Sequence, residues 1–242
     1  MPDSGNLTVG IVGAGRLGSA IALAAAREQV PVVLTATGGG WVVRGRPDVL
    51  IDASAPAALD RVADYCRTES VPLVECVSYA EPEHLARLDE LARTVRILHA
   101  TNLALGNHLQ RRLIDAVGEY HQALEAEVGV RERHPVRKAP RPSATAWGLA
   151  ARSSAAAARK PPEPAFSRTG GEVSDHEITW SWPDGESLTV RHSVGSLARS
   201  AGCALAAARW VRALPPGASS IDEVHLAARS DGPVRARPEA AR

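Results

Sequence analysis

A glycine-rich turn near the start of the chain restricts its possible folds more than any other feature. Gly13, Gly15 and Gly18 form a Gly-x-Gly-x-x-Gly pattern between an apolar run, residues 7–12, and an alanine-rich helical stretch, residues 17–27. In a strand-to-helix turn the first glycine allows the tight turn, the second lets the backbone approach a pyrophosphate, and the third lets the helix pack closely on the strand. The pattern predicts a dinucleotide-binding turn, and a tight turn without a ligand is the alternative.

The residues around this turn bear on which dinucleotide it would bind. Arg16 and Leu17 lie at the predicted helix start, where free backbone N–H groups can hold a phosphate. The second predicted strand ends in Thr35-Ala36-Thr37, with no Asp or Glu for the ribose hydroxyls of NAD. Hydroxyl groups there, with Arg16 or Arg44 nearby, would tolerate a 2′-phosphate. We therefore expect NADPH, with NADH as the alternative, and count Thr35 among the cofactor-binding residues.

Strand and helix patterns divide the chain into two parts. Up to residue 104, short apolar strands alternate with amphipathic helices, which predicts a parallel sheet covered on both faces. Between residues 37 and 48 a crossover helix barely fits, so this half-unit is expected to be shortened. The later part predicts a helix at 105–124, a strand at 125–133, a helix at 143–158, a loop at 160–171, a hairpin of strands at 176–182 and 187–194, and a helix at 196–213.

These patterns predict an α/β protein. Residues 1–104 together with 215–242 would form a Rossmann-like nucleotide-binding domain, and the tail from residue 230 would be frayed. Residues 105–214 would form an α+β domain for substrate binding and oligomerisation, with an open mixed sheet. Trp180 and Trp182 would be exposed on one face of that sheet, so we expect the protein to self-associate.

Composition excludes several classes of function. A formal net charge of +1 gives no electrostatic reason to expect nucleic-acid binding. No apolar run reaches the roughly 18 residues that a membrane span needs, and the first residues do not resemble a signal peptide, so we expect a cytoplasmic protein away from membranes. The cysteines Cys66, Cys76 and Cys203 lie far apart without a Cys-x-x-Cys pair. We therefore expect neither a disulfide nor a metal site.

The segment from residue 132 to 145 carries the most chemistry. His134 and Lys138 stand four residues apart, and Ser143 and Thr145 follow at a predicted helix start. Reduction of a C=N or conjugated C=C bond needs a proton beside the hydride, and a histidine can supply it near neutral pH. A lysine would stabilise developing negative charge, hydroxyls and helix N–H groups would hold a substrate carboxylate, and Arg137 would add positive field. A loop histidine and a simple helix cap are the structural alternatives.

This segment resembles the signature of the dihydrodipicolinate reductase family, Glu-x-His-His-x-x-Lys-x-Asp-x-Pro-Ser-Gly-Thr-Ala. The resemblance implies that His134 is the proton donor and Lys138 the catalytic lysine. It also implies one Rossmann-like lobe and one mixed-sheet substrate lobe. The expected substrate is small and carboxylated, and the expected assembly is a homotetramer or homodimer. Further matches are Asp52-Ala53-Ser54-Ala55-Pro56, Ala100-Thr101-Asn102, and Arg168, Gly170 and His176, so the resemblance adds Ser54 to the cofactor-binding residues and Asn102 to the substrate-binding residues.

Several positions depart from the family pattern. Glu75-Cys76-Val77-Ser78 stands where the family has Gly-Thr-Thr-Gly beside the nicotinamide, so Glu75 and Cys76 are predicted to face the cofactor. Pro135 replaces the second histidine, and Ser196 falls where the family has an arginine. We therefore predict an NAD(P)H-dependent reductase of a carboxylated cyclic imine or enamine, in specialised metabolism. The alternatives are true 4-hydroxy-tetrahydrodipicolinate reductase, and a non-redox descendant that uses the His/Lys pocket for binding, dehydration or cyclisation.

Overall fold

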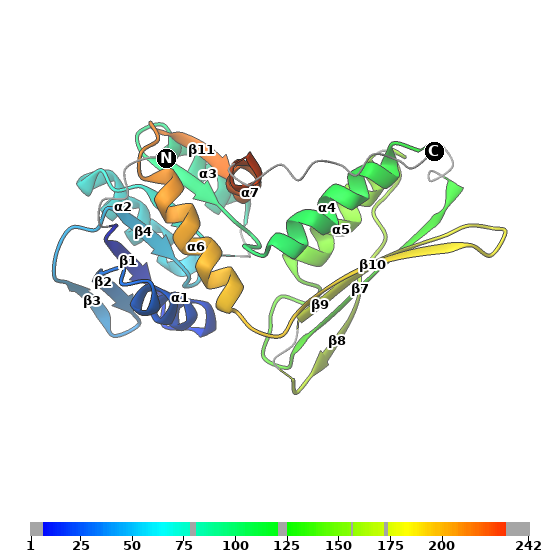
Figure 1. Cartoon of the computed structure of the whole chain (residues 1–242), viewed down its shortest axis with the longest axis horizontal. Helices are drawn as coiled ribbons and strands as arrows, with labels where there is room; N and C mark the ends of the chain where they lie inside the picture. The colour runs from blue at the N-terminus through cyan, green and yellow to red at the C-terminus, as the bar shows by residue number, and fades with distance from the viewer. Residues whose placement is uncertain (1–6, 78–80, 121–124, 156, 172–173, 231–242) are drawn as a thin grey trace, which may run out of the picture.

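The structure is a computed structural model that describes residues 7–77, 81–120, 125–155, 157–171 and 174–230. Predictions made for Ser78 and for the tail from residue 231 onward lie outside the described residues. Figure 1 shows two lobes, each built on its own sheet. The fold class predicted from sequence is confirmed. No helix in the described part of the chain is both long and apolar enough to cross a membrane.

The first lobe contains a seven-stranded sheet in the order β11-β6-β5-β4-β1-β2-β3. All of its neighbouring strands are parallel except β2 and β3, which form an antiparallel pair. This hairpin takes the place of a crossover helix, as the short spacing predicted. The strands are β1 (Val9–Val12), β2 (Val32–Thr37), β3 (Gly40–Val43), β4 (Val49–Asp52), β5 (Leu73–Glu75), β6 (Arg96–His99) and β11 (Gly217–Ser220).

Helices cover both faces of this sheet, and the alternation of each strand decides which core its side chains enter. Val9, Ile11 and Ile51 pack against helices α1 and α6, whereas Leu50 and Leu73 pack against α2 and α3. Period-two alternation is the reason, because successive side chains of a strand point to opposite faces. The helices are α1 (Arg16–Arg27), η1 (Pro56–Ala58), α2 (Leu59–Glu69), α3 (Pro82–Ala92), α6 (Ala198–Val211) and α7 (Ile221–Ser230).

The C-terminal part of the chain returns to the first lobe. Strand β11 pairs with β6, and α6 buries Ala201, Ala204 and Leu205 in the same core as α1. The sequence assigned α6 to the second domain because it follows the hairpin directly, but its packing places it in the first lobe. We therefore propose that the second domain ends near residue 197 rather than 214.

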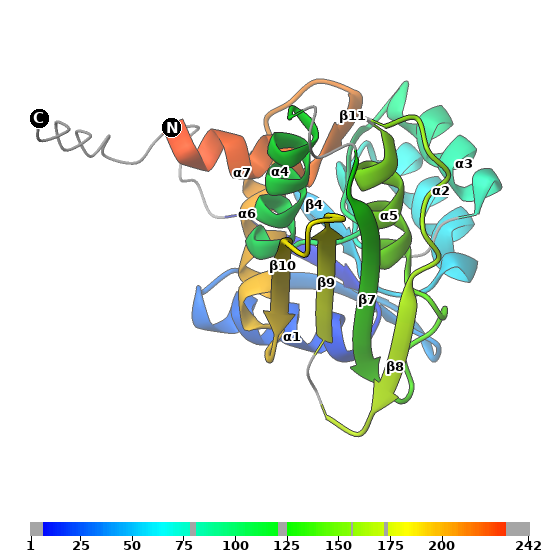
Figure 2. The ribbon, with the colours of Figure 1, turned by 90° about the vertical axis from the view of Figure 1, so that its right-hand side faces the viewer.

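The second lobe has a four-stranded mixed sheet in the order β10-β9-β7-β8, with two helices on one face (Figures 1 and 2). Strand β8 runs parallel to β7, and the other pairs are antiparallel. The elements are α4 (Leu105–Gly118), β7 (Glu127–Pro135), α5 (Ala144–Ala155), β8 (Ala165–Thr169), β9 (Ser174–Ser181) and β10 (Ser187–Val194).

Three expectations for this lobe need correction. Helix α4 ends at Gly118, and the predicted loop at 160–171 contains β8. That stretch lacks an alternating pattern, but its backbone gains hydrogen-bond partners along β7, so tertiary pairing overrides local propensity. Trp180 is only 3% exposed because it packs with Ile114 and Leu149 beneath α4 and α5. It therefore gives no reason for self-association, and the open face of the sheet is the opposite one.

Candidate active site

The glycine turn between β1 and α1 has the geometry that a phosphate site needs. Gly13 has a φ of +100°, a conformation that favours glycine, and a Cβ on Gly18 would lie 2.0 Å from the Gly13 carbonyl oxygen. A Cβ on Gly15 would meet no atom within 4 Å. Helix α1 begins without a side-chain cap, so its first N–H groups face this open space. The turn therefore fits the pyrophosphate of a dinucleotide.

A cavity of about 650 Å³ lies beside this turn, between the two lobes. It brings together residues that are up to 184 positions apart in the sequence, from Arg16 to Ser200. Most of the predicted site residues line it: Arg16, Leu17, Ser54 and Cys76 from the first lobe, and Asn102, His134, Lys138, Ser143 and Thr145 from the linker and the second lobe.

Three predicted site residues lie elsewhere. Arg137 lies in the turn after β7, where it is exposed and does not line the cavity. Thr35 is exposed on β2, outside the cavity wall. Glu75 is buried on the α2 and α3 side of the sheet, where it shares a very small cavity with His84 and His99. The predicted bulk of Glu75 beside the nicotinamide is therefore directed away from the cleft.

Burial of Glu75 has an electrostatic consequence. One of its carboxyl oxygens accepts a hydrogen bond from the Val77 backbone at 2.8 Å, while the other is buried without a partner among the described residues. Asp52 occupies the neighbouring register position on β4. Burial, and then the charge of Asp52, raise the pKa of Glu75 well above its ordinary value. Burial therefore favours the protonated form of the Glu75 carboxyl.

The Glu132 carboxylate organises the wall of the cavity on the second lobe. Its side chain is 0% exposed, and it accepts hydrogen bonds from the Ser143 backbone at 3.1 Å, from the Ser143 hydroxyl, and from Arg168 at 2.8 Å. Burial alone would raise the pKa of Glu132, but hydrogen bonds from His134, Ser143 and Arg168 outweigh burial and lower the pKa to about 2. A carboxylate that stays ionised thus fixes the start of helix α5 and strand β8.

His134 and His176 form a buried pair beside this carboxylate. Their Nε2 atoms lie 3.1 Å apart, and His134 Nε2 lies 3.4 Å from a Glu132 oxygen. Burial, followed by the charge of His134, lowers the pKa of His176 to about 3. His176 is therefore neutral near pH 7, and His134 lies between it and the Glu132 carboxylate.

Lys138 lies in the turn after β7 and lines the same cavity. Burial lowers the pKa of its ammonium group; Glu132 opposes this effect, and Arg168 and Arg16 add to it. Across the lobe boundary, Asn102 donates from Nδ2 to the Thr145 hydroxyl at 3.5 Å. The Ser143 hydroxyl caps helix α5 by accepting the Ala146 N–H at 3.2 Å. Lys138 and the start of α5 thus form a positive end of the cavity.

Glu132, His134 and His176 also present three ligand-type atoms within 4.8 Å of one another. Two imidazoles and a carboxylate are a common zinc set. Here, however, the carboxylate is already paired with the Arg168 guanidinium, and the Lys138 ammonium lies in the same wall. A divalent cation would add positive charge to a set of side chains whose net charge is already positive. This wall therefore fits an anion better than a metal.

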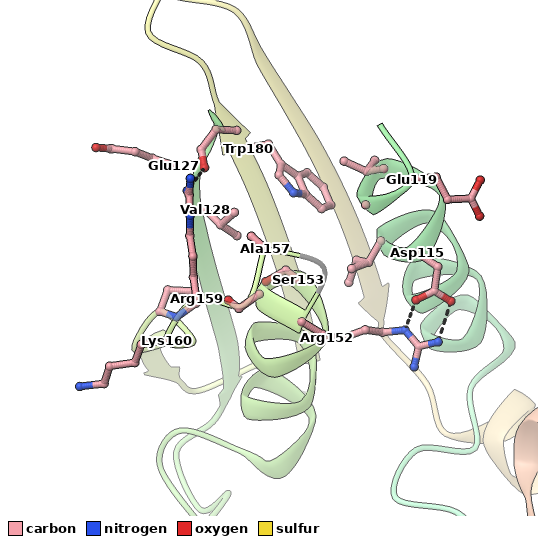
Figure 3. A pocket seen from close by; sticks show the side chains of 17 residues that line it. Asp115, Glu119, Glu127, Val128, Arg152, Ser153, Ala157, Arg159, Lys160 and Trp180 are labelled. Carbon is pink, nitrogen blue, oxygen red and sulfur yellow. Dashed lines mark hydrogen bonds and ion pairs between the residues drawn. The ribbon is translucent and has the colours of Figure 1, made fainter. Parts of the chain in front are cut away.

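A larger cavity of about 810 Å³ opens at the far end of the second lobe (Figure 3). Arg152 on α5 reaches Asp115 on α4 through two hydrogen bonds of 2.6 Å, and Trp180 points into the space between α4 and β7 (Figure 3). None of the predicted site residues lines this cavity. Its lining contains as many acidic as basic side chains, and Arg152 is paired with Asp115. The cavity therefore lacks the converging positive groups of the inter-lobe cleft.

Sequence reasoning assigned no role to Glu132, Arg168 or His176, yet the structure places all three at the site. Glu132 lies two residues before His134, and this spacing alone puts both on one face of a strand. This spacing in the sequence was therefore sufficient to suggest Glu132 as a site residue. His176 is 42 residues away, and no spacing rule connects it to His134; the antiparallel register of β7 and β9 does so.

Comparisons with known proteins agree with this arrangement. The sequence profile of the dihydrodipicolinate reductase N-terminus matches residues 37–103, and the profile of the C-terminus matches residues 106–224. The chain is 28% identical to 4-hydroxy-tetrahydrodipicolinate reductase of Caulobacter vibrioides over 89% of this chain and 96% of that protein. It is 38% identical to the enzyme of the same name from Alkaliphilus metalliredigens, over 41% of each chain.

Solved structures show the same fold. The dipicolinate-bound dihydrodipicolinate reductase from Paenisporosarcina sp. TG-14 matches with a TM-score of 0.67 at 16% identity, covering 90% of this chain and 98% of that one. The DAP dehydrogenase of C. glutamicum in complex with DAP matches with a TM-score of 0.52 at 13% identity, covering 90% and 93%. These identities are low, so the likeness concerns the fold.

A nucleotide-binding lobe that faces a mixed-sheet lobe across one cleft defines the class of two-lobed dinucleotide-dependent reductases. Within that class, the matched profiles together cover most of the chain. The chain belongs to the dihydrodipicolinate reductase family, and its first lobe is the NAD(P)-binding domain of that family.

Proposed function

We propose that this protein is an NAD(P)H-dependent reductase that reduces a C=N or conjugated C=C bond of a small carboxylated cyclic imine or enamine. The observation that carries the proposal is the shared cavity, in which the glycine turn and Ser54 meet His134 and Lys138. A hydride site and a proton site must lie on either side of one substrate, and this cleft provides both. NADPH is the cofactor we favour, with NADH as the alternative.

The first lobe would hold the cofactor. The N–H groups at the start of α1 would bind the pyrophosphate above Gly15, and Arg16 and Leu17 would line its path into the cleft. Ser54 is fixed for this task, because its backbone N–H and its hydroxyl donate to Asp52 at 2.9 and 2.5 Å. The bound cofactor supplies a hydride. Cys76 contributes an apolar surface, since burial raises the pKa of its thiol and keeps it protonated.

The second lobe would supply the proton. When His134 is protonated, its Nε2–H is held between the Glu132 carboxylate and the neutral His176, so its Nδ1–H is the proton available for transfer. Glu132 stabilises the imidazolium without taking its proton, because the pKa of Glu132 is about 2. This arrangement would place a carboxylate beside the imidazolium form of His134.

Lys138 and the start of α5 would bind the substrate carboxylate. The ammonium provides a compact charge, and the Ala144 and Thr145 N–H groups provide donors at a helix N-terminus. Asn102 fixes the Thr145 hydroxyl from the other lobe. These groups are already oriented by their own contacts, so binding requires little rearrangement.

True 4-hydroxy-tetrahydrodipicolinate reductase is the second candidate, supported by the names of relatives at 26–38% identity. The non-redox alternative rested on Glu75 and Cys76 at the nicotinamide face; the Glu75 side chain lies in a separate small cavity, whereas Cys76 lines the cleft. We retain the reductase of a different imine as the preferred proposal for two reasons: Pro135 replaces the second histidine of the family signature, and Ala144, which lines the cavity, stands where that signature has glycine between Ser and Thr.

Two measurements test the proposal. Titration with NADPH and with NADH, followed by energy transfer from tryptophan, should show binding of at least one. Oxidation of the bound nucleotide, followed at the nicotinamide absorbance band, should then depend on an added cyclic imine carboxylate. Absence of binding for both nucleotides would favour the non-redox alternative, and ordinary turnover of the lysine-pathway substrate would favour the second candidate.

We also propose that the protein self-associates through the open face of the second sheet. On this face Asp175 joins Arg133 and Arg191 through hydrogen bonds of 2.6 and 2.8 Å, and Thr179 contacts Thr189 at 2.9 Å. None of the described helices of this chain covers it (Figure 2). Light scattering on the purified protein should give a mass of two or four chains.

A further inference from the structure

The inter-lobe cavity has an unequal distribution of charge. Among its described lining residues, the permanently charged side chains are Arg16 and Lys138, and none is acidic. Arg16 is the first residue of α1, beside Leu17 and the glycine turn, so it belongs to the cofactor side. Lys138 is therefore the permanent cation that the described substrate side offers.

Among the other basic groups near this wall, His134 is the proposed proton donor to the reduced bond, and Arg168 and His176 are not available to a second anion. The Arg168 side chain is 7% exposed, and it donates to Glu132 at 2.8 Å and to the Lys138 and Pro140 carbonyl oxygens at 3.1 Å. It lies behind the wall rather than in it. His176 lines the cavity, but burial lowers its pKa to about 3, so it carries no charge near pH 7.

The wall formed by the end of β10 and the start of α6 is uncharged. Val194, Leu197 and Ser200 line the cavity there. Ser196, the position where sequence analysis expected an arginine in the family, does not line it. A carboxylate placed against this wall would lose its hydration without gaining a cation, which is unfavourable.

Building on the proposed reductase function, we propose that the substrate is a cyclic imine or enamine with a single carboxylate. The carboxylate binds Lys138 and the start of α5, next to the bond that is reduced. The rest of the ring presents an uncharged flank to Val194 and Leu197. A dicarboxylate of the same ring size is a poor ligand, because its second carboxylate would meet this apolar wall.

Isothermal titration calorimetry with two stable planar mimics tests this inference without turnover. The protein, saturated with oxidised nucleotide, is titrated with pyridine-2-carboxylate and with pyridine-2,6-dicarboxylate. We expect the monocarboxylate to bind at least about tenfold more tightly, the equivalent of 1.4 kcal/mol. Equal or tighter binding of the dicarboxylate overturns the single-carboxylate inference while leaving the reductase proposal intact. Binding of neither mimic to a protein that binds nucleotide overturns both.

A charge added to the apolar wall provides a second, independent readout. Leu197→Arg should raise the affinity for pyridine-2,6-dicarboxylate about tenfold or more, because the new guanidinium would pair with the second carboxylate. Leu197→Gln, which adds length and polarity without charge, should not. If both variants leave the dicarboxylate affinity unchanged, Val194 and Leu197 do not form the wall that the second carboxylate meets, and the inference is wrong.

Discussion

His134 and His176 face each other through their Nε2 atoms at 3.1 Å, and the Glu132 carboxylate lies 3.4 Å from the first ring and 3.7 Å from the second. One of the two facing nitrogens must donate and the other accept. Because His176 is neutral near pH 7, its Nε2 can accept a hydrogen bond from His134. The pair therefore stabilises charge on the ring that we propose as the proton donor.

Replacement of His176 should change the pH profile rather than binding. In His176→Phe the acceptor for His134 is lost, so the protonated form of His134 is less stable. We expect the alkaline limb of the kcat profile to move to lower pH and kcat at pH 8 to fall about tenfold. His176→Gln, which keeps an acceptor oxygen, should restore part of the profile. A uniform loss at every pH would indicate a purely structural role.

Lys138→Ala should lower turnover by about 10²- to 10³-fold, because it removes the charge that would bind the substrate carboxylate and stabilise the transition state. Nucleotide affinity should stay near that of the parent protein. Lys160 is the only other lysine in the sequence, and it lines the separate cavity of the second lobe, so Lys160→Ala is the matched control. An equal loss of turnover and nucleotide affinity in Lys138→Ala would contradict the assigned role.

Substitutions at two glycines of the turn should affect different properties, one the stability of the fold and the other the affinity for nucleotide. Gly18→Ala places a Cβ 2.0 Å from the Gly13 carbonyl oxygen, so we expect a loss of about 2 kcal/mol in unfolding free energy. The Cβ of Gly15→Val would meet no atom within 4 Å, so we expect the free protein to keep its Tm while nucleotide affinity falls at least about tenfold. Denaturant unfolding and fluorescence titration measure both. Unchanged nucleotide affinity in Gly15→Val would refute the phosphate site.

Glu132 should make stability depend on acidity. Its pKa falls from an ordinary 4.5 to about 2 in the fold, so it contributes about 3 kcal/mol that is fully present above pH 4.5 and lost as the pH falls toward 2. Glu132→Gln removes this contribution and leaves Arg168 without its anion. We expect urea unfolding to show a loss of about 3 kcal/mol at pH 7 that becomes smaller at pH 3.5. A pH-independent difference would show that the fold does not lower the pKa of Glu132.

Glu75 should make the stability of the fold depend on pH in the opposite direction from Glu132. Its pKa is raised by burial and by Asp52, so the unfolded chain loses the proton near pH 4.5 while the folded chain keeps it. Wild-type stability therefore falls as the pH rises above 4.5. Glu75→Gln does not titrate, and its Tm advantage over the wild type should grow between pH 5 and pH 8. The exposed Glu119→Gln is the control, and no change of the difference with pH would count against a protonated Glu75.

The sequence by itself determined the local features of this protein. The glycines of the turn are required by the backbone at those positions, and the apolar alternation of β1, β4 and β5 is set by the two faces that each strand must bury. The short span between β2 and β4 already excluded a crossover helix. The segment that contains His134 and Lys138 could also be recognised from the sequence, because its residues are close together in the chain.

The tertiary structure alone decided how distant segments meet. The pairing of β7 with β9 brings His176 to His134, and the pairing of β7 with β8 brings Arg168 to Glu132. Glu75 is directed away from the cleft because its position on β5 faces the other side of the sheet. Trp180 is buried because helices pack over it. Strand register and helix docking depend on the sum of many contacts across the fold, so no window of the sequence contains them.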